Sequence, residues 1–158
     1  MAITLVYADL VAAYPNVPLA EVKTLIGGRV DADWIENACA LRVSRALNYG
    51  GLPVPFIRDA DKKQQTVTGA DGKWYIFRVT VLANFLAKQL GAAAITAKAR
   101  AAGGVDGGAF IGIKGIIGMK VSGWSNATGH FTLWTGSACI DGTNYLPEAS
   151  SAWLWKAT

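Results

Sequence analysis

Apolar residues in the first half of the chain recur at every third or fourth position, the spacing of an amphipathic helix. Leu82, Phe85 and Leu86 fall on one face of a helix over residues 79–90, and Gly91 follows as a stop signal. The first half is therefore predicted to be largely helical. The same signals predict three further helices, over residues 8–14, from Pro18 to the pair Gly27-Gly28, and over residues 37–48.

The second half has a different pattern, in which short β-branched and aromatic segments alternate with glycine and turn residues. This pattern is typical of antiparallel strands. Helices followed by strands predict an α+β fold, with N-terminal helices packed on a C-terminal antiparallel sheet. A length of 158 residues fits one domain over residues 1–158. The predicted strands lie at residues 109–113, 115–121, 130–134 and 153–155, and a short aromatic segment at 74–77 follows the turn Asp71-Gly72.

Composition and charge narrow the class of protein. With 52% apolar and 16% charged residues, the chain is far from the composition of a disordered protein. The net charge of +4 is spread along the chain, so nucleic acid is not indicated as a partner. The N-terminus lacks a basic leader and carries Asp9 early, which argues against a secretory signal. No run of about 20 apolar residues predicts membrane insertion.

His130 is the only histidine, so any histidine-dependent chemistry must use it. Cys39 falls in the first turn of the helix that Asn37 is expected to cap, where the helix dipole favours a thiolate. His130 can accept the thiol proton, and Asp141 can fix the imidazole tautomer through its other nitrogen. The sequence thus predicts Cys39, His130 and Asp141 as a catalytic triad.

Each of these residues also has a structural interpretation. Cys39 falls on one helical stripe with Val43 and Leu47 and would suit the core as a small apolar residue. His130 can be a hydrogen-bonded structural residue, and Asp141 precedes a glycine, as in many turns. Cys39 and Cys139 can also form a disulfide, which would remove the nucleophile. These alternatives stay open at the level of the local pattern.

Other candidate sites are fewer. One histidine and two distant cysteines do not form a zinc-binding pattern, and no glycine-rich motif predicts a phosphate cofactor, so we expect no cofactor and no metal. Most of the six tryptophans are expected in the core. Trp124 is the exception, because it lies in a polar turn that leads to the histidine. Asn37, Trp124 and Gly129 are predicted to contact the substrate.

Two motifs together resemble a known family. They are Asn-Ala-Cys-Ala-Leu-Arg-Val-Ser at residues 37–44 and Gly-His-Phe-Thr-Leu-Trp at residues 129–134, with Gly-Trp at 123–124 and Asp141. The combination resembles the type VI secretion amidase effectors of the fourth family, relatives of the NlpC-type papain-like peptidases. The likeness runs from about residue 34 to residue 155.

The resemblance implies a cysteine amidase that cuts the γ-D-glutamyl to meso-diaminopimelate bond in the stem peptides of peptidoglycan. Position by position, Cys39 matches the nucleophile, His130 the base and Asp141 the third residue. The resemblance also implies an antibacterial toxin that is made in the cytoplasm of the producer and injected by the type VI secretion apparatus into the periplasm of the target cell. A cognate immunity protein is the expected inhibitor. In the mechanism expected, the Cys39 backbone N–H helps to hold the oxyanion.

The chain departs from the family at one place. Relatives commonly carry a second cysteine shortly after the one that matches Cys139, which closes a small disulfide loop, whereas Thr143 and Asn144 occupy that region here. A free thiol is then one alternative for Cys139, whose redox state the sequence does not fix. The alternatives to the amidase are another papain-like cysteine peptidase or acyltransferase and a non-catalytic cell-wall binding module, in which the tryptophans would bind and Cys39 would be inert.

Overall fold

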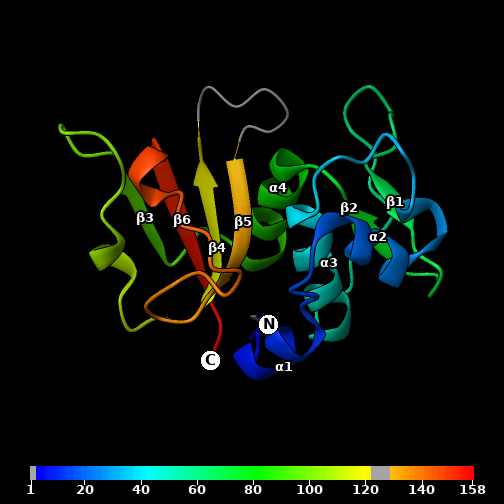
Figure 1. The fold of residues 1–158 in the computed structure, drawn as a ribbon, viewed down its shortest axis with the longest axis horizontal. Helices are drawn as coiled ribbons and strands as arrows, with labels where there is room; N and C mark the ends of the chain where they lie inside the picture. The colour runs from blue at the N-terminus through cyan, green and yellow to red at the C-terminus, as the bar shows by residue number, and fades with distance from the viewer. Residues whose placement is uncertain (1–2, 122–128) are drawn as a thin grey trace.

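The computed structural model describes residues 3–121 and 129–158 (Figure 1). It contains a four-stranded antiparallel sheet in the order β3-β6-β4-β5 and a separate pair, β1-β2. The helices gather at the β5 end of the sheet and behind it (Figure 1). The predicted α+β architecture is confirmed. The strands are β1 (Thr66–Thr68), β2 (Trp74–Ile76), β3 (Ile95–Lys98), β4 (Gly115–Lys120), β5 (Gly129–Trp134) and β6 (Ser151–Lys156).

The four predicted α-helices all form, each within two residues of its predicted limits. Two of them end at glycines with positive φ, Gly27 at 67° and Gly91 at 80°, a conformation in which a side chain would be strained. The helices are α1 (Tyr7–Ala13), α2 (Leu19–Ile26), α3 (Cys39–Tyr49) and α4 (Val79–Leu90), and three 3-10 helices are η1 (Gly28–Val30), η2 (Gly107–Phe110) and η3 (Leu146–Glu148). Among the described residues, the longest helix has 12 residues, too few to cross a membrane.

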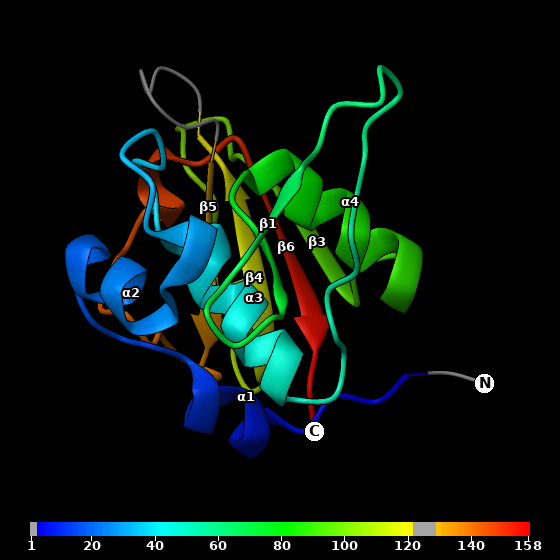
Figure 2. The ribbon, with the colours of Figure 1, turned by 90° about the vertical axis from the view of Figure 1, so that its right-hand side faces the viewer.

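The helix α3 lies at the centre of the molecule. It sits beside the edge strand β5, and Figure 2 shows it in front of the sheet when the molecule is seen from the side of α2 and β1. Its polar residues tie it to β2, because Ser44 Oγ accepts the Ile76 N–H at 3.0 Å and Asn48 Nδ2 donates to Trp74 O at 2.8 Å. These hydrogen bonds fix the middle and the C-terminal end of α3 against β2.

The sheet buries both of its faces. One face carries Phe131 and Leu133 and packs in a cluster with Leu47 of α3 and Leu82 and Leu86 of α4. The opposite face packs against the loops that precede β4 and follow β5, and its cluster contains Ile117, Met119, Trp134, Phe110 and Leu146. Since strand residues alternate between faces, His130, Thr132 and Trp134 share the second face of β5.

Two parts of the second half differ from the prediction. The strand predicted at residues 109–113 is wrong, because η2 occupies this place: Asp106 Oδ1 accepts the Gly108 N–H at 2.9 Å and starts a tight turn. The strand β3 was not predicted. Its residues alternate between partly buried and exposed, and its pairing with β6 at the edge of the sheet is a tertiary contact that the local pattern does not contain.

Candidate functional site

Cys39 is the first residue of α3 and is 98% buried, with 2% of its surface exposed. Asn37 Oδ1 accepts the Cys39 backbone N–H at 2.9 Å. The N-cap residue of the helix is Ala38, which makes no side-chain cap hydrogen bond, so the prediction that Asn37 is the N-cap is wrong by one residue. The N-terminal end of a helix carries a partial positive charge. The local sequence therefore places the Cys39 thiol at the positive end of the helix dipole.

His130 is the second residue of β5, and 8% of its surface is exposed. It faces Met119 across the β4-β5 pair. The preceding Gly129 is buried in the same pairing, where an added Cβ would lie 2.1 Å from Met119 O. This close backbone approach gives Gly129 a packing role, and it keeps the strand that carries His130 flat against β4.

Asp141 reaches His130 through a tight hairpin after β5. The Ile140 N–H donates to Leu133 O at 2.9 Å, and Gly142, with φ 77°, turns the chain so that its N–H donates to Cys139 O at 3.1 Å. The N-terminal segment also supports this hairpin, since Asn16 Nδ2 donates to Ile140 O at 3.0 Å. The result is a contact of 2.8 Å between Asp141 Oδ2 and His130 Nε2.

The three predicted residues meet in space. Asp141 binds the imidazole of His130 at Nε2. Cys39 is hydrogen-bonded to the same ring, so Nδ1 is the ring nitrogen on the side of the thiol. Tyr145 contacts the imidazole edge to face, with ring centroids 5.0 Å apart. The structural alternatives for His130 and Asp141 do not require such an arrangement, whereas a nucleophile, a base and an orienting carboxylate do.

The charges of His130 and Asp141 stabilise each other. Burial lowers the pKa of His130, but the hydrogen bonds and negative charges of Asp141 and Cys39 outweigh it and raise the pKa to about 9. Burial of Asp141 raises its pKa, but hydrogen bonds from His130 and Thr143 lower it to about 2. At neutral pH, the site thus holds an ionised carboxylate and a protonated imidazole.

Two residues near the triad, Thr143 and Tyr14, were not predicted from the sequence. Thr143 donates its hydroxyl to Asp141 Oδ1 at 2.6 Å, its N–H binds the same oxygen at 3.0 Å, and its Oγ1 lies 3.2 Å from His130 Nε2. The hydroxyl of Tyr14 lies 2.9 Å from Thr132 Oγ1, and the charges of Asp141 and Cys39 act on it. The Asp-Gly-Thr spacing was a signal for Thr143, because a threonine two residues after an aspartate often binds its carboxylate. Tyr14 is 118 residues from Thr132, and no local signal marks it.

Cys139 is buried beside Trp134 on the other side of the hairpin, and it is a free thiol. The alternative of a disulfide between Cys39 and Cys139 is wrong, since both cysteines are free. Burial and the charge of Asp141 raise the pKa of the Cys139 thiol to about 12, although a hydrogen bond with Thr143 acts against them. Cys139 therefore stays protonated at neutral pH.

The Cys39 N–H, which is expected to hold the oxyanion, donates to Asn37 Oδ1 in this structure, and its contact with the oxyanion stays a prediction. Asn37 therefore binds the first residue of α3 through its side chain, and its contact with the substrate stays a prediction. Trp124 lies outside the described residues. In residues 3–121 and 129–158, no group of three or more His, Cys, Asp or Glu side chains is arranged to hold a metal ion.

Comparison with protein families decides the assignment. The model of the type VI secretion system amidase effector protein 4 family, Tae4, matches residues 35–155. The chain belongs to this family. It is an amidase effector of type VI secretion, and the resemblance stated from the two motifs is confirmed. No curated protein sequence matches the chain.

Solved structures of Tae4 proteins have the same fold. Tae4 in the type VI effector-immunity complex Tae4-Tai4 from Enterobacter cloacae is 34% identical, with a TM-score of 0.84 over 99% of this chain and 100% of that one. Tae4 in the corresponding complex from Salmonella Typhimurium is 32% identical, with a TM-score of 0.84 and the same coverage of both chains. The type VI effector Tae4 from Enterobacter cloacae, in a further crystal structure, is 34% identical, with a TM-score of 0.84 over 100% of both chains.

Proposed function

We propose that this Tae4 family member hydrolyses the γ-D-glutamyl to meso-diaminopimelate amide bond of peptidoglycan stem peptides, with Cys39 as nucleophile, His130 as base and acid, and Asp141 as the orienting residue. One observation carries the proposal: Cys39 at the start of α3 is hydrogen-bonded to the imidazole of His130, and Asp141 holds the other nitrogen of this ring at 2.8 Å. This geometry fits acyl transfer through a covalent intermediate.

In the first half of the reaction, the Cys39 thiolate attacks the amide carbonyl carbon and forms a tetrahedral oxyanion. The C–N bond then breaks, His130 gives its proton to the departing diaminopimelate amine, and the D-glutamyl group remains on Cys39 as a thioester. The raised pKa of His130, about 9, keeps the imidazole protonated until this step. Asp141 stabilises the imidazolium and holds its orientation.

In the second half, neutral His130 takes a proton from water, and the hydroxide attacks the thioester carbonyl. The C–S bond breaks, the γ-carboxylate of D-glutamate leaves, and the proton on the imidazole restores the starting pair. The dipole of α3 points its positive end at this centre and stabilises the negative charge in both tetrahedral intermediates. Because the Cys39 N–H is bound to Asn37, the oxyanion needs donors other than this group, or a rotation of the Asn37 side chain.

The biological setting follows from family membership. A type VI effector is made in the producing cell and injected, and peptidoglycan lies in the periplasm of the target, so we place the site of action there. The Tae4 proteins solved from Enterobacter cloacae and Salmonella Typhimurium are bound to the immunity protein Tai4. A cognate immunity protein that covers the Cys39 site would protect the producing cell.

The test is mass spectrometry of purified muropeptides after incubation with the wild type and with Cys39→Ala. The expected products are a fragment that ends at D-glutamate and a fragment with a free diaminopimelate amine, both absent with the variant. Circular dichroism serves as the control for folding of the variant. Cleavage by Cys39→Ala, or cleavage at another bond, would contradict the proposal.

A further inference from the structure

The linker between α1 and α2, residues 14–17, is a stiff segment that runs close to the catalytic site. Its sequence is Tyr-Pro-Asn-Val, and a second proline follows at residue 18. Proline fixes its own φ and restricts the residue before it, so this linker has few conformations to choose from. A tight turn adds to this, because the Val17 N–H donates to Pro15 O at 2.9 Å. Such a segment can hold the elements that it contacts in a fixed relation.

Two side chains of the linker bind the strand and the hairpin that carry the base and its carboxylate. The hydroxyl of Tyr14 lies 2.9 Å from Thr132 Oγ1. Thr132 is two residues after the catalytic histidine on β5, so the two side chains point to the same face of the strand. Asn16 Nδ2 donates to Ile140 O at 3.0 Å, and the next residue along the chain is Asp141. The linker thus contacts β5 and the hairpin directly beside two members of the triad.

The same linker is tied to the helix that carries the nucleophile. Arg42, three residues after Cys39 on α3, donates from Nη2 to Val17 O at 2.8 Å. Tyr14 also lies near this part of the helix: burial raises the pKa of its hydroxyl, and the charge of Cys39 adds to the rise. The linker therefore joins α3 to β5 and its hairpin, although these elements are far apart in the sequence.

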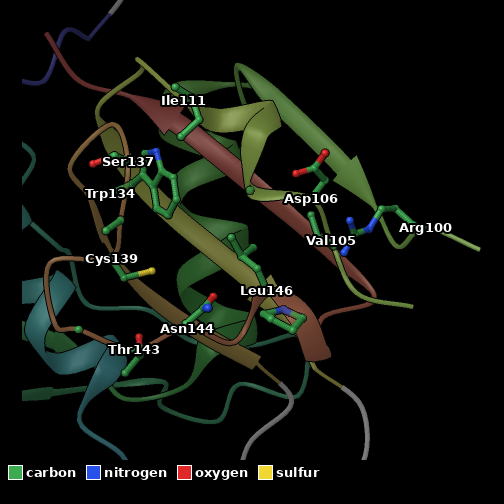
Figure 3. A pocket seen from close by; sticks show the side chains of 14 residues that line it. Arg100, Val105, Asp106, Ile111, Trp134, Ser137, Cys139, Thr143, Asn144 and Leu146 are labelled. Carbon is green, nitrogen blue, oxygen red and sulfur yellow. The ribbon is translucent and has the colours of Figure 1, made fainter. Parts of the chain in front are cut away.

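The hairpin depends on this contact because its other side borders a cavity. There it lines a pocket of about 530 Å³, with Cys139 and Thr143 among the lining residues (Figure 3). Ile140, between Cys139 and Asp141, packs instead with the apolar cluster that contains Tyr14. A cavity offers no atoms to pack against. The pairing with β5 and the contacts with the linker therefore set how closely Asp141 approaches the imidazole.

We propose that Tyr14 and Asn16 are positioning residues of the catalytic site, because the linker that carries them fixes β5 and its hairpin against the first turn of α3. This inference rests on the proposed function, since it concerns the same triad. Tyr14, which is buried, acts through Thr132. Asn16, which is exposed, acts more weakly through Ile140.

The experiment measures three properties of Tyr14→Phe, which removes one hydroxyl group: kcat and KM for muropeptide cleavage, the pKa of His130 by NMR, and the rate at which iodoacetamide alkylates Cys39. We expect kcat to fall about fivefold while KM stays within about twofold. The pKa of His130 should fall below about 9, because the hydrogen bond from Asp141 that raises it is held less firmly. Alkylation of Cys39 should slow as well, because the imidazolium beside the thiol is less well placed.

The matched control is Tyr75→Phe. Tyr75 is also buried, and its hydroxyl donates to Asp71 Oδ2 at 2.7 Å within the part of the core that α2 covers. This variant removes one tyrosine hydrogen bond that no member of the triad shares. Its kcat, its rate of Cys39 alkylation and the pKa of His130 should stay at the wild-type values.

Asn16→Ala tests the second contact of the linker. Because the hydrogen bond to Ile140 O is exposed to water, we expect kcat to fall only about twofold. Asn16→Gln keeps an amide donor and should restore part of the rate.

A double variant separates positioning from stability. In Tyr14→Phe, the hydroxyl of the buried Thr132 loses its partner, and the Tm should fall. Tyr14→Phe combined with Thr132→Val removes both polar groups and should recover most of the Tm. We expect kcat and the pKa of His130 to stay low in the double variant, because the hydrogen bond between the linker and β5 is still absent.

The outcomes separate this inference from the proposed function. Recovery of kcat together with the Tm in the double variant would show a purely structural role and overturn the inference. An unchanged pKa of His130 and an unchanged alkylation rate in Tyr14→Phe, or equal losses in Tyr75→Phe, would overturn it too. If the wild type leaves muropeptides intact while Tyr14→Phe still shifts the pKa of His130 and slows alkylation of Cys39, the proposed function is overturned and the positioning role is supported.

Discussion

Cys39 and Cys139 are both buried free thiols, with 2% and 7% of their surfaces exposed, and both lie near Asp141. Cys39 begins a helix and is hydrogen-bonded to His130, whose pKa rises in response. Cys139 lies in an apolar cluster, and burial raises its pKa to about 12. The comparison teaches that burial alone does not set the chemistry of a cysteine: the helix dipole and the imidazole distinguish the two sites.

Substitution of each cysteine by alanine gives the largest expected difference. Cys39→Ala should lower the rate of muropeptide cleavage by about 10⁴-fold or more, because the nucleophile of a covalent mechanism is removed. Cys139→Ala removes a thiol of similar burial and should keep the rate within about threefold, the matched control for a general packing effect. The rates are measured by chromatography of muropeptides. Similar losses of cleavage rate in both variants would contradict the different roles of the two cysteines.

Alkylation tests the same contrast without a mutation. Iodoacetamide at neutral pH should modify Cys39 about 100-fold faster than Cys139 or more, because Cys139 has a raised pKa and is almost wholly a thiol. Peptide mapping by mass spectrometry gives the two rates. Equal labelling of both cysteines, or labelling of Cys139 first, would show that the helix N-terminus and His130 do not activate Cys39.

Asp141→Asn tests the support given to His130. The variant removes a negative charge that raises the pKa of His130, so this pKa should fall from about 9, and cleavage should slow by about 100-fold. NMR titration can follow the change without assignment problems, because His130 is the only histidine. Asp9→Asn, at a distant carboxylate, is the control. An unchanged pKa of His130 would refute the role of Asp141.

The raised pKa of His130 also predicts a pH dependence. The protonated imidazole is present below about pH 9 and is lost as the pH rises through that value. Cleavage needs this proton for the leaving amine, so kcat/KM should fall by about tenfold for each pH unit above 9. In Asp141→Asn the fall should begin at a lower pH. A wild-type rate that is constant up to pH 10.5 would contradict this assignment of the acid.

Thr143→Ala should have the smallest effect. The hydroxyl of Thr143 donates to Asp141 Oδ1 at 2.6 Å and acts on His130 only through this carboxylate, so we expect a loss of about fivefold in kcat. The pKa of Asp141 should rise slightly. Thr143→Ser keeps the hydroxyl and should restore the rate. A loss in Thr143→Ser as large as in Thr143→Ala would show that the methyl group, and not the hydroxyl, matters.

Local sequence signals were sufficient to predict helices whose start and end signals lie within one short segment. The helix α4 has its predicted limits because its apolar spacing and Gly91 lie within one short segment. The start of α3 was predicted to within two residues for the same reason, since Asn37 and Cys39 are close in the chain. The strand predicted at residues 109–113 failed because β-branched residues indicate a strand only where a neighbouring strand pairs with them, and here Asp106 directs a turn.

The sequence by itself determined the residue types of the site and the family: one histidine, two cysteines, an aspartate in a turn, and two motifs that a family model also recognises. Only the tertiary structure decided that Cys39, His130 and Asp141 meet, that Cys139 does not pair with Cys39, and that Thr143 and Tyr14 join the site. The physical reason is that motifs are set by residues close in the chain, whereas Cys39 and His130 are brought together by the packing of α3 against β5. That packing depends on the whole apolar core, which no short pattern contains.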